Sequence, residues 1–324
     1  MKNFFIFIML ACLSVELSFG QGQEAKTNAN HILSVRTNDD NTCHKVVKDW
    51  ELFSEGYDTL QQVVFWREVV NLDPEHYIIY SLESREILGY AETSEWNRKS
   101  PAAKKAFIEE RRNDMEIPRG NTIVTAQGRQ DFYLFQETIP NISKAVDIFN
   151  KDHTDPWYAQ AILLIESPGA RVKTSYAGAR GSFQIMPEVG REMGLIVNET
   201  TDERTNFTKS AHAAAKLIRQ NCVPQAKAML NRRGIAFHET DLWFRLLVMH
   251  CYHAGAGNVN SALTSMGAKK GGKELIVKLW KTTAGGFGNE SQNYSQIALA
   301  AIMELSNIVD SQGDIVCGQS EEEW

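Results

Sequence analysis

Apolar and polar residues recur with a helical period from about Thr138 toward the C-terminus. The stretch Pro156–Glu166 is apolar along most of its length, so it predicts a buried helix. Asp155 suits the N-cap of that helix, and Pro156 suits its first position. Further helices are expected over residues 202–218, 242–252, 273–280 and 291–309. The fold class predicted for this part of the chain is therefore mainly α.

The preceding residues, 43–136, follow a mixed pattern. Helical periods appear around residues 57–72 and 101–113, and strand-like runs at 77–82 and 122–125 lie between turn signals. We therefore expect a small mixed α/β N-terminal extension before a helical domain at 137–312. The polar residues 21–42 are interpreted as a flexible lead-in, and 313–324 as a solvated acidic tail.

The N-terminus has the pattern of a secretory signal. Lys2 precedes an apolar run, residues 4–13, and Ser18-Phe19-Gly20 provides small residues for a signal peptidase, so residues 1–20 are predicted to be cleaved. The run is too short for a transmembrane helix. A lipoprotein cleavage site at Cys12 is the alternative.

Five cysteines occur, and one of them, Cys12, lies in the predicted signal. In an oxidising compartment the other four permit three pairings, and their spacing does not choose among them. These four residues are Cys43, Cys222, Cys251 and Cys317. Cys251 also suits a small core position in the helix over 242–253.

Composition and incomplete motifs argue against several classes of function. The chain has 324 residues, 43% hydrophobic side chains and a net charge of −6, which fits a folded protein without a basic patch for nucleic acid. His238-Glu239 begins like a zinc-protease motif but lacks the second histidine, and Gly285-Gly286-Phe287-Gly288 lacks the lysine of a phosphate-binding loop. No metal, cofactor or nucleic acid is therefore expected.

Glu166 is the main candidate for chemistry. It is the one ionisable residue of the apolar helix and stands at the C-terminal end, where the helix dipole and apolar surroundings both raise the pKa of a carboxyl group. A carboxylic acid that keeps its proton at neutral pH suits general-acid cleavage of a glycosidic bond. The alternative is a structural ion pair, for example with Arg180.

Four segments, in order, resemble the transglycosylase domain shared by lytic transglycosylases and goose-type lysozymes. They are Glu166-Ser167 followed by Ser175 and GARGSFQIMP (178–187), DERTNFTKSAHAAAKLI (202–218), CYHAGAGNV (251–259) and ESQNY (290–294). The second segment is most similar to the membrane-bound type D branch, without the LysM repeats that such relatives often carry. The chain departs from the pattern at Ser182-Phe183, at His253 in place of Asn, and at Ser291 in place of Thr.

The resemblance implies a lysozyme-like α-helical catalytic domain that acts on peptidoglycan glycan strands. Glu166 would be the single catalytic acid of a reaction that leaves 1,6-anhydro-N-acetylmuramic acid ends. Substrate-binding roles are implied for Ser175, Gln184, Met186, Tyr252, His253, Glu290 and Tyr294; Glu290 is alternatively an anchor for the last helix.

The predicted signal, together with a cell-wall substrate, implies a place of action. Export would put the protein in the periplasm, or at the outer membrane if Cys12 carries lipid. The extension at 43–136 would brace the catalytic domain or bind a protein of the cell envelope. Two other functions stay open: a glycan-binding scaffold that has lost turnover, and a lysozyme-type hydrolase.

Overall fold

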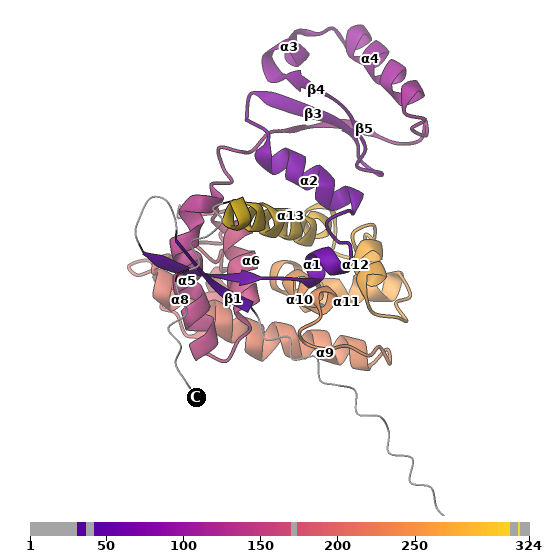
Figure 1. Cartoon of the computed structure of the whole chain (residues 1–324). Coiled ribbons are helices and arrows are strands. Elements are labelled where there is room, and N and C mark those ends of the chain that lie inside the picture. Colours follow the sequence, from indigo (N-terminus) through magenta and orange to yellow (C-terminus); the bar gives the residue numbers. More distant parts are fainter. Residues whose placement is uncertain (1–30, 37–41, 170–173, 312–316, 318–324) are drawn as a thin grey trace, which may run out of the picture.

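The computed structural model describes residues 31–36, 42–169, 174–311 and 317. They form a helical lobe and a small α/β subdomain that stands on one side of it (Figure 1). The predicted fold class, mainly α with a small mixed α/β extension, is confirmed. No helix of the described residues is long and apolar enough to cross a membrane.

Helix α6 (Pro156–Glu166) is the central helix of the lobe, and its first nine residues are buried. Its start is fixed as predicted, because Oδ1 of Asp155 accepts a 2.9 Å hydrogen bond from the backbone nitrogen of Trp157. Arg245 donates from Nε to Oδ2 of the same Asp155 at 2.8 Å. Arg245 therefore holds the N-cap residue in place. Because the start of α6 is fixed in the lobe, the position of its C-terminal residue, Glu166, is fixed as well.

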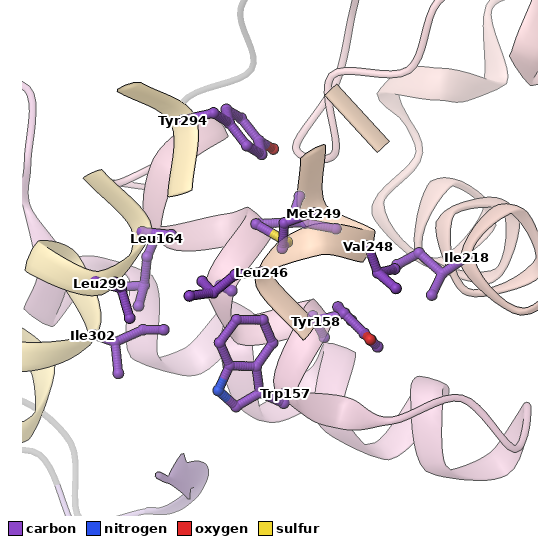
Figure 2. Close-up of a cluster of buried hydrophobic side chains, with 14 of the residues drawn as sticks. Trp157, Tyr158, Leu164, Ile218, Leu246, Val248, Met249, Tyr294, Leu299 and Ile302 are labelled. Atoms are coloured by element: carbon purple, nitrogen blue, oxygen red, sulfur yellow. The ribbon is translucent and has the colours of Figure 1, made fainter. Parts of the chain in front are cut away.

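Three long helices enclose α6 with apolar side chains. They are α5 (Phe135–Lys151), α10 (Leu242–Ala254) and α13 (Asn289–Ser311). In the cluster of Figure 2, Leu164 of α6, Leu246 of α10 and Leu299 of α13 lie together, and each is fully buried. In this core, helices that are far apart in sequence pack against the helix that ends in Glu166.

Shorter helices complete the lobe. The segment predicted as one helix at 202–218 divides into a 3₁₀ turn and a helix, which then continues through a π-helical turn. The elements are α1 (Glu51–Ser54), α7 (Pro187–Met193), η1 (Glu203–Thr205), α8 (Phe207–Leu217), the π-helix η2 (Ile218–Cys222), α9 (Val223–Asn231), α11 (Ala256–Ser265) and α12 (Lys273–Leu279).

The α/β subdomain is a three-stranded antiparallel sheet with helices on both faces. Its elements are β3 (His76–Ser81) in the centre, β4 (Ile87–Glu92) and β5 (Ile123–Gln127) at the edges, α2 (Gln61–Asn71), α3 (Thr93–Arg98) and α4 (Pro101–Asp114). Phe65 of α2 packs against Ile78 on one face, and Ile79 packs with Trp96 on the other. Strand residues thus alternate between two small cores.

Helix α2 joins the subdomain to α13. Nε of Arg67 donates to Oε1 of Glu304 at 2.6 Å, and Nε1 of Trp66 donates to Oε1 of Gln296 at 3.2 Å. The subdomain is consequently fastened along the outer side of α13 (Figure 1).

The predicted flexible lead-in at 21–42 is wrong for six of its residues. His31–Arg36 forms strand β1, which pairs antiparallel with β2 (Cys43–Lys48). Gln160 of α6 bonds to both the backbone nitrogen and the carbonyl of Val47, so β2 is attached to the core helix. The strand is formed by pairing with the next strand along the chain, from Arg36 opposite Cys43 to His31 opposite Lys48.

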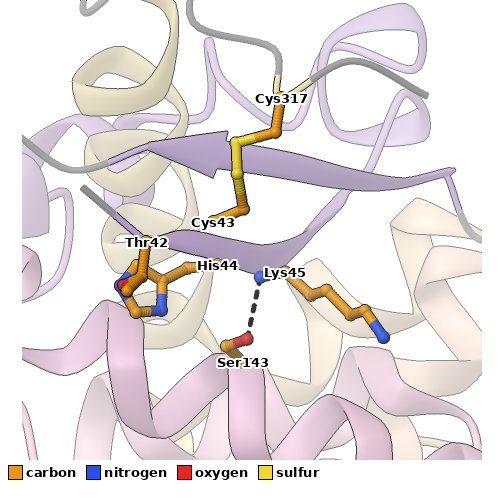
Figure 3. Close-up of a disulfide and its surroundings, with 6 residues drawn as sticks. All are labelled: Thr42, Cys43, His44, Lys45, Ser143 and Cys317. Atoms are coloured by element: carbon orange, nitrogen blue, oxygen red, sulfur yellow. Dashed lines mark hydrogen bonds between the residues drawn. A yellow bond between two sulfur atoms is a disulfide. The ribbon is translucent and has the colours of Figure 1, made fainter. Parts of the chain in front are cut away.

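One cysteine pairing is now fixed. Cys43 of β2 forms a disulfide with Cys317 (Figure 3), while Cys222 and Cys251 are free and buried. The burial of Cys251 confirms its interpretation as a core residue. The predicted signal at 1–20 and, apart from Cys317, the predicted tail at 313–324 lie outside the described residues.

Candidate active site

Glu166 is the last residue of α6, and its side chain is half-buried. Burial raises the pKa of its carboxyl group to about 7, and a hydrogen bond from Tyr294 opposes the rise. Loss of water favours the neutral form, whereas a donor favours the carboxylate. Glu166 can therefore hold or release a proton near neutral pH, as a group that acts first as an acid and then as a base requires.

The partner of this carboxyl group is Tyr294 of α13, whose hydroxyl donates to Oε1 of Glu166 at 2.8 Å. Tyr294 is 4% exposed. Burial raises the pKa of its hydroxyl well above 10, and the nearby charge of Glu166 raises it further. The tyrosine thus stays protonated and acts as a permanent donor.

His253 of α10 stacks on Tyr294, with ring centroids 4.2 Å apart and an angle of 18° between the planes. Burial lowers the pKa of the imidazole, while Glu290 acts in the opposite direction. His253 is therefore neutral at pH 7. Four of the candidate residues, Glu166, Tyr294, His253 and Glu290, lie close together, and Glu290 is exposed in the first turn of α13.

Tyr252 anchors the segment that follows Gly181. Its hydroxyl donates to the backbone carbonyl of Phe183 at 2.6 Å. The phenyl ring of Phe183 is fully buried and stacks on Phe149 at 6.0 Å. Ser182 is buried as well, and its carbonyl accepts a 3.0 Å bond from Oγ of Ser167. Phe183 contacts Tyr252 through its backbone carbonyl, and its ring packs into the core. The departure from the family pattern at Ser182-Phe183 therefore alters the core beneath the site.

The loop from Thr174 to Met186 carries the remaining candidates. Oγ of Ser175 accepts a 2.9 Å bond from the nitrogen of Ala179, and Nε2 of Gln184 donates to the carbonyl of Gly181 at 2.9 Å. Met186 is 36% exposed at the start of α7. Ser175 and Gln184 thus shape the loop in this state, and Met186 offers an apolar surface at its end.

An arginine clamp, Arg204 with Asp202, fastens this loop. Nη1 of Arg204 donates to the carbonyls of Gly178 at 2.8 Å and Ile185 at 2.9 Å. Asp202 binds Arg204 and also accepts a 3.1 Å bond from Arg180. The alternative ion pair between Arg180 and Glu166 is therefore not formed. The sequence pattern contained Asp202 and Arg204 but did not reveal this role.

Tyr133 is a further residue at the site that sequence analysis missed. It precedes α5 and is 8% exposed. Burial raises the pKa of its hydroxyl to about 12; Arg129 lowers it, and the charge of Glu166 raises it. Tyr133 therefore lies within electrostatic reach of the catalytic candidate. The only local signal is an aromatic run, Phe132-Tyr133 with Phe135, which is also typical of core residues.

No group of three His, Cys, Asp or Glu residues in the part of the chain that the structure describes is arranged to hold a metal ion.

Residues 146–275 match the family model described as Transglycosylase SLT domain. The match begins within α5 and ends within α12, so it includes Glu166, the clamped loop, Tyr252 and His253. Tyr133 and Tyr294 lie outside it, although both are near Glu166 in space. No curated protein sequence matches the chain significantly.

Proposed function

Since the chain carries a transglycosylase SLT domain, the domain of lytic transglycosylases that act on peptidoglycan, we propose that Glu166 is its single catalytic acid. We further propose that cleavage between N-acetylmuramic acid and N-acetylglucosamine leaves a 1,6-anhydro ring. The observation that carries this proposal is the carboxyl group of Glu166 at the end of α6, which accepts a 2.8 Å hydrogen bond from Tyr294 and whose pKa burial raises to about 7.

The reaction proceeds in two steps on one side chain. Glu166 first gives its proton to the glycosidic oxygen, and the bond from that oxygen to C1 of the muramic acid breaks. The substrate's own acetamide supports the positive charge at C1. The carboxylate then removes the proton of the C6 hydroxyl, and O6 forms the new bond to C1. No water is consumed, and Glu166 regains its proton.

The neighbouring residues divide into two groups in this proposal. Tyr252, Ser175 and Gln184 surround the acetamide and the acid. His253, Met186, Tyr294 and Glu290 contact the sugars. The donor bond of Tyr294 holds one oxygen of Glu166, so the other oxygen faces the substrate. A neutral His253 beside Tyr294 adds no positive charge that would draw the proton off Glu166.

We place the enzyme in the periplasm after cleavage of residues 1–20. The disulfide between Cys43 and Cys317 supports an oxidising compartment. Intact mass of the protein from its native host checks this. A mature chain that begins at Gln21 agrees with it, diacylglyceryl on Cys12 means a lipid-anchored form instead, and an uncleaved Met1 contradicts export by cleavage.

Mass spectrometry of digested peptidoglycan tests the reaction. Wild-type protein should release muropeptides with anhydro ends, and Glu166→Gln should retain less than about a tenth of the rate while folding normally. Glu188→Gln is the matched control, because Glu188 is exposed on α7. Reducing ends would mean a lysozyme-type hydrolase. Binding to wall polymer without release of fragments would mean a glycan-binding scaffold.

A further inference from the structure

A cavity of about 600 Å³ lies at the opposite end of α6 from Glu166. It is formed by the turn before α6, by η2, by α9 and by the segment around Glu239. Tyr158, in the first turn of α6, lines it. Eight residues separate Tyr158 from Glu166, which is about 12 Å along the helix. The cavity is therefore distinct from the proposed glycan site.

The surface of this cavity is mostly apolar. Ile218 and Tyr158, which are 1% and 2% exposed, belong to the core and also reach the cavity. Val223, Pro224 and Ala228 of α9 supply another wall. The volume and the apolar walls fit a small organic molecule, since sites for such ligands are typically 300–1,000 Å³ and apolar with a few polar groups.

Tyr158 is the unusual polar group of the cavity. Its hydroxyl is buried and has no hydrogen-bond partner among the described residues. In Figure 2 the ring of Tyr158 extends toward the side of the molecule where Ile218 lies. A buried hydroxyl without a partner is unfavourable and uncommon. A bound molecule with a hydrogen-bond acceptor would satisfy it.

Four charged side chains line the cavity, Asp155, Arg219, Lys227 and Glu239, and in the described part of the chain Arg219 is the one among them without an ion-pair partner. Lys227 pairs with Glu239, and Asp155 is bound by Arg245 at 2.8 Å. Arg219 of η2 is exposed and forms no ion pair within the described part of the chain. A guanidinium without an ion-pair partner at the edge of an apolar cavity is available to bind the anionic end of a ligand.

We propose that this cavity binds a small amphipathic carboxylate. Its apolar body lies between Ile218 and α9, its carboxylate meets Arg219, and an acceptor on the body receives the hydroxyl proton of Tyr158. This binding function is separate from glycan cleavage and does not depend on Glu166.

Calorimetric titration of the full chain with 4-(4-methoxyphenyl)butanoate tests the proposal. This probe has an apolar ring, a carboxylate and an ether oxygen as acceptor. We expect saturable binding to one site. Arg219→Gln should weaken it about tenfold or more, and replacing the carboxylate of the probe by an amide should have a similar effect on the wild type. Arg232→Gln, which removes an exposed arginine that does not line this cavity, should leave binding unchanged.

Two further variants separate the cavity from general surface binding. Ala228→Trp fills the space from an exposed position on α9 and should abolish binding without lowering the melting temperature. Tyr158→Phe should weaken binding several-fold, and the unliganded variant should fold as the wild type does. Absence of saturable binding at millimolar probe, or binding that survives Ala228→Trp, overturns the proposal.

Discussion

Arg85, in the turn between β3 and β4, donates a 2.8 Å hydrogen bond from Nη2 to Oδ1 of Asn293 on α13. The two residues are 7% and 8% exposed. Asn293 directly precedes Tyr294, the donor to Glu166. The α/β subdomain therefore contacts α13 at the turn that carries the partner of the proposed catalytic acid.

Asn293→Ala should lower the free energy of unfolding by about 1–3 kcal/mol, because it removes an acceptor from the buried guanidinium of Arg85. We also expect a several-fold loss of glycan release, since Tyr294 follows directly. Asn307→Ala, on an exposed part of α13, is the matched control. Urea unfolding and a turnover assay measure both effects. Equal stability of the two variants would show that the Arg85 bond is dispensable.

Glu166→Gln should change the dependence of stability on pH. The pKa of Glu166 is about 7 in the folded chain and 4.5 without the fold. The folded state therefore binds more protons between these values, and wild-type stability falls as pH rises through this window. Glu166→Gln has no carboxyl group to titrate, so its free energy of unfolding does not fall in this window. Above pH 7 it should exceed that of the wild type by about 1–3 kcal/mol, a range that allows for the partial exposure of the side chain. Thermal unfolding at pH 5 and pH 8 measures the difference, and a constant difference would refute the raised pKa.

His253→Asn restores the residue expected from the resemblance. Burial lowers the pKa of His253 below 6.5, so the wild-type imidazole becomes charged only as the pH falls into the acidic range. That charge, stacked on Tyr294, should disfavour the protonated form of Glu166 and reduce turnover. The Asn variant should keep its activity near neutral pH and lose this acidic decline. A pH–rate profile from about 5 to 8 tests it; an unchanged profile would mean that His253 is structural.

Gly181→Ala should loosen the clamped loop. Gly181 has a φ of +84°, and a Cβ there would lie 1.9 Å from the carbonyl oxygen of Arg204. Gly178→Ala is a matched control, with a φ of +93° and no atom within 4 Å. The control should cost about 1–2 kcal/mol of stability for the left-handed backbone. Gly181→Ala should cost at least about 2 kcal/mol more and lower activity, because the clash is with backbone. Comparable unfolding curves for the two variants would contradict the close approach.

The predictable parts of the fold are those with local causes. The limits of α6 follow from Asp155, Pro156 and an apolar run, and all three act within the segment. Strand β4 was not predicted, because Gly89 interrupts its pattern. A Cβ at that position would lie 3.1 Å from the ring of Phe107, so the glycine leaves room for α4. That reason exists only once the subdomain has folded.

The candidate site also combines residues that the sequence indicates with contacts that exist only in the folded chain. The end of the apolar helix pointed to Glu166 and the resemblance added Tyr294, yet 128 residues separate the two, and their hydrogen bond results from the packing of α6 against α13. Tyr133 has no motif and reaches the site only through the path of the chain before α5. The same holds for Phe183, whose departure from the pattern is explained by its stacking on Phe149.

The disulfide between Cys43 and Cys317 spans 274 residues of sequence and makes the chain between them a covalent ring. Every helix of the described residues lies inside that ring, from α1 to α13. A single cut by a protease in a surface loop would therefore open the ring without separating two fragments. A pulling force applied at the two cysteines would be carried by the sulfur–sulfur bond, and the helices around Glu166 would bear no mechanical load.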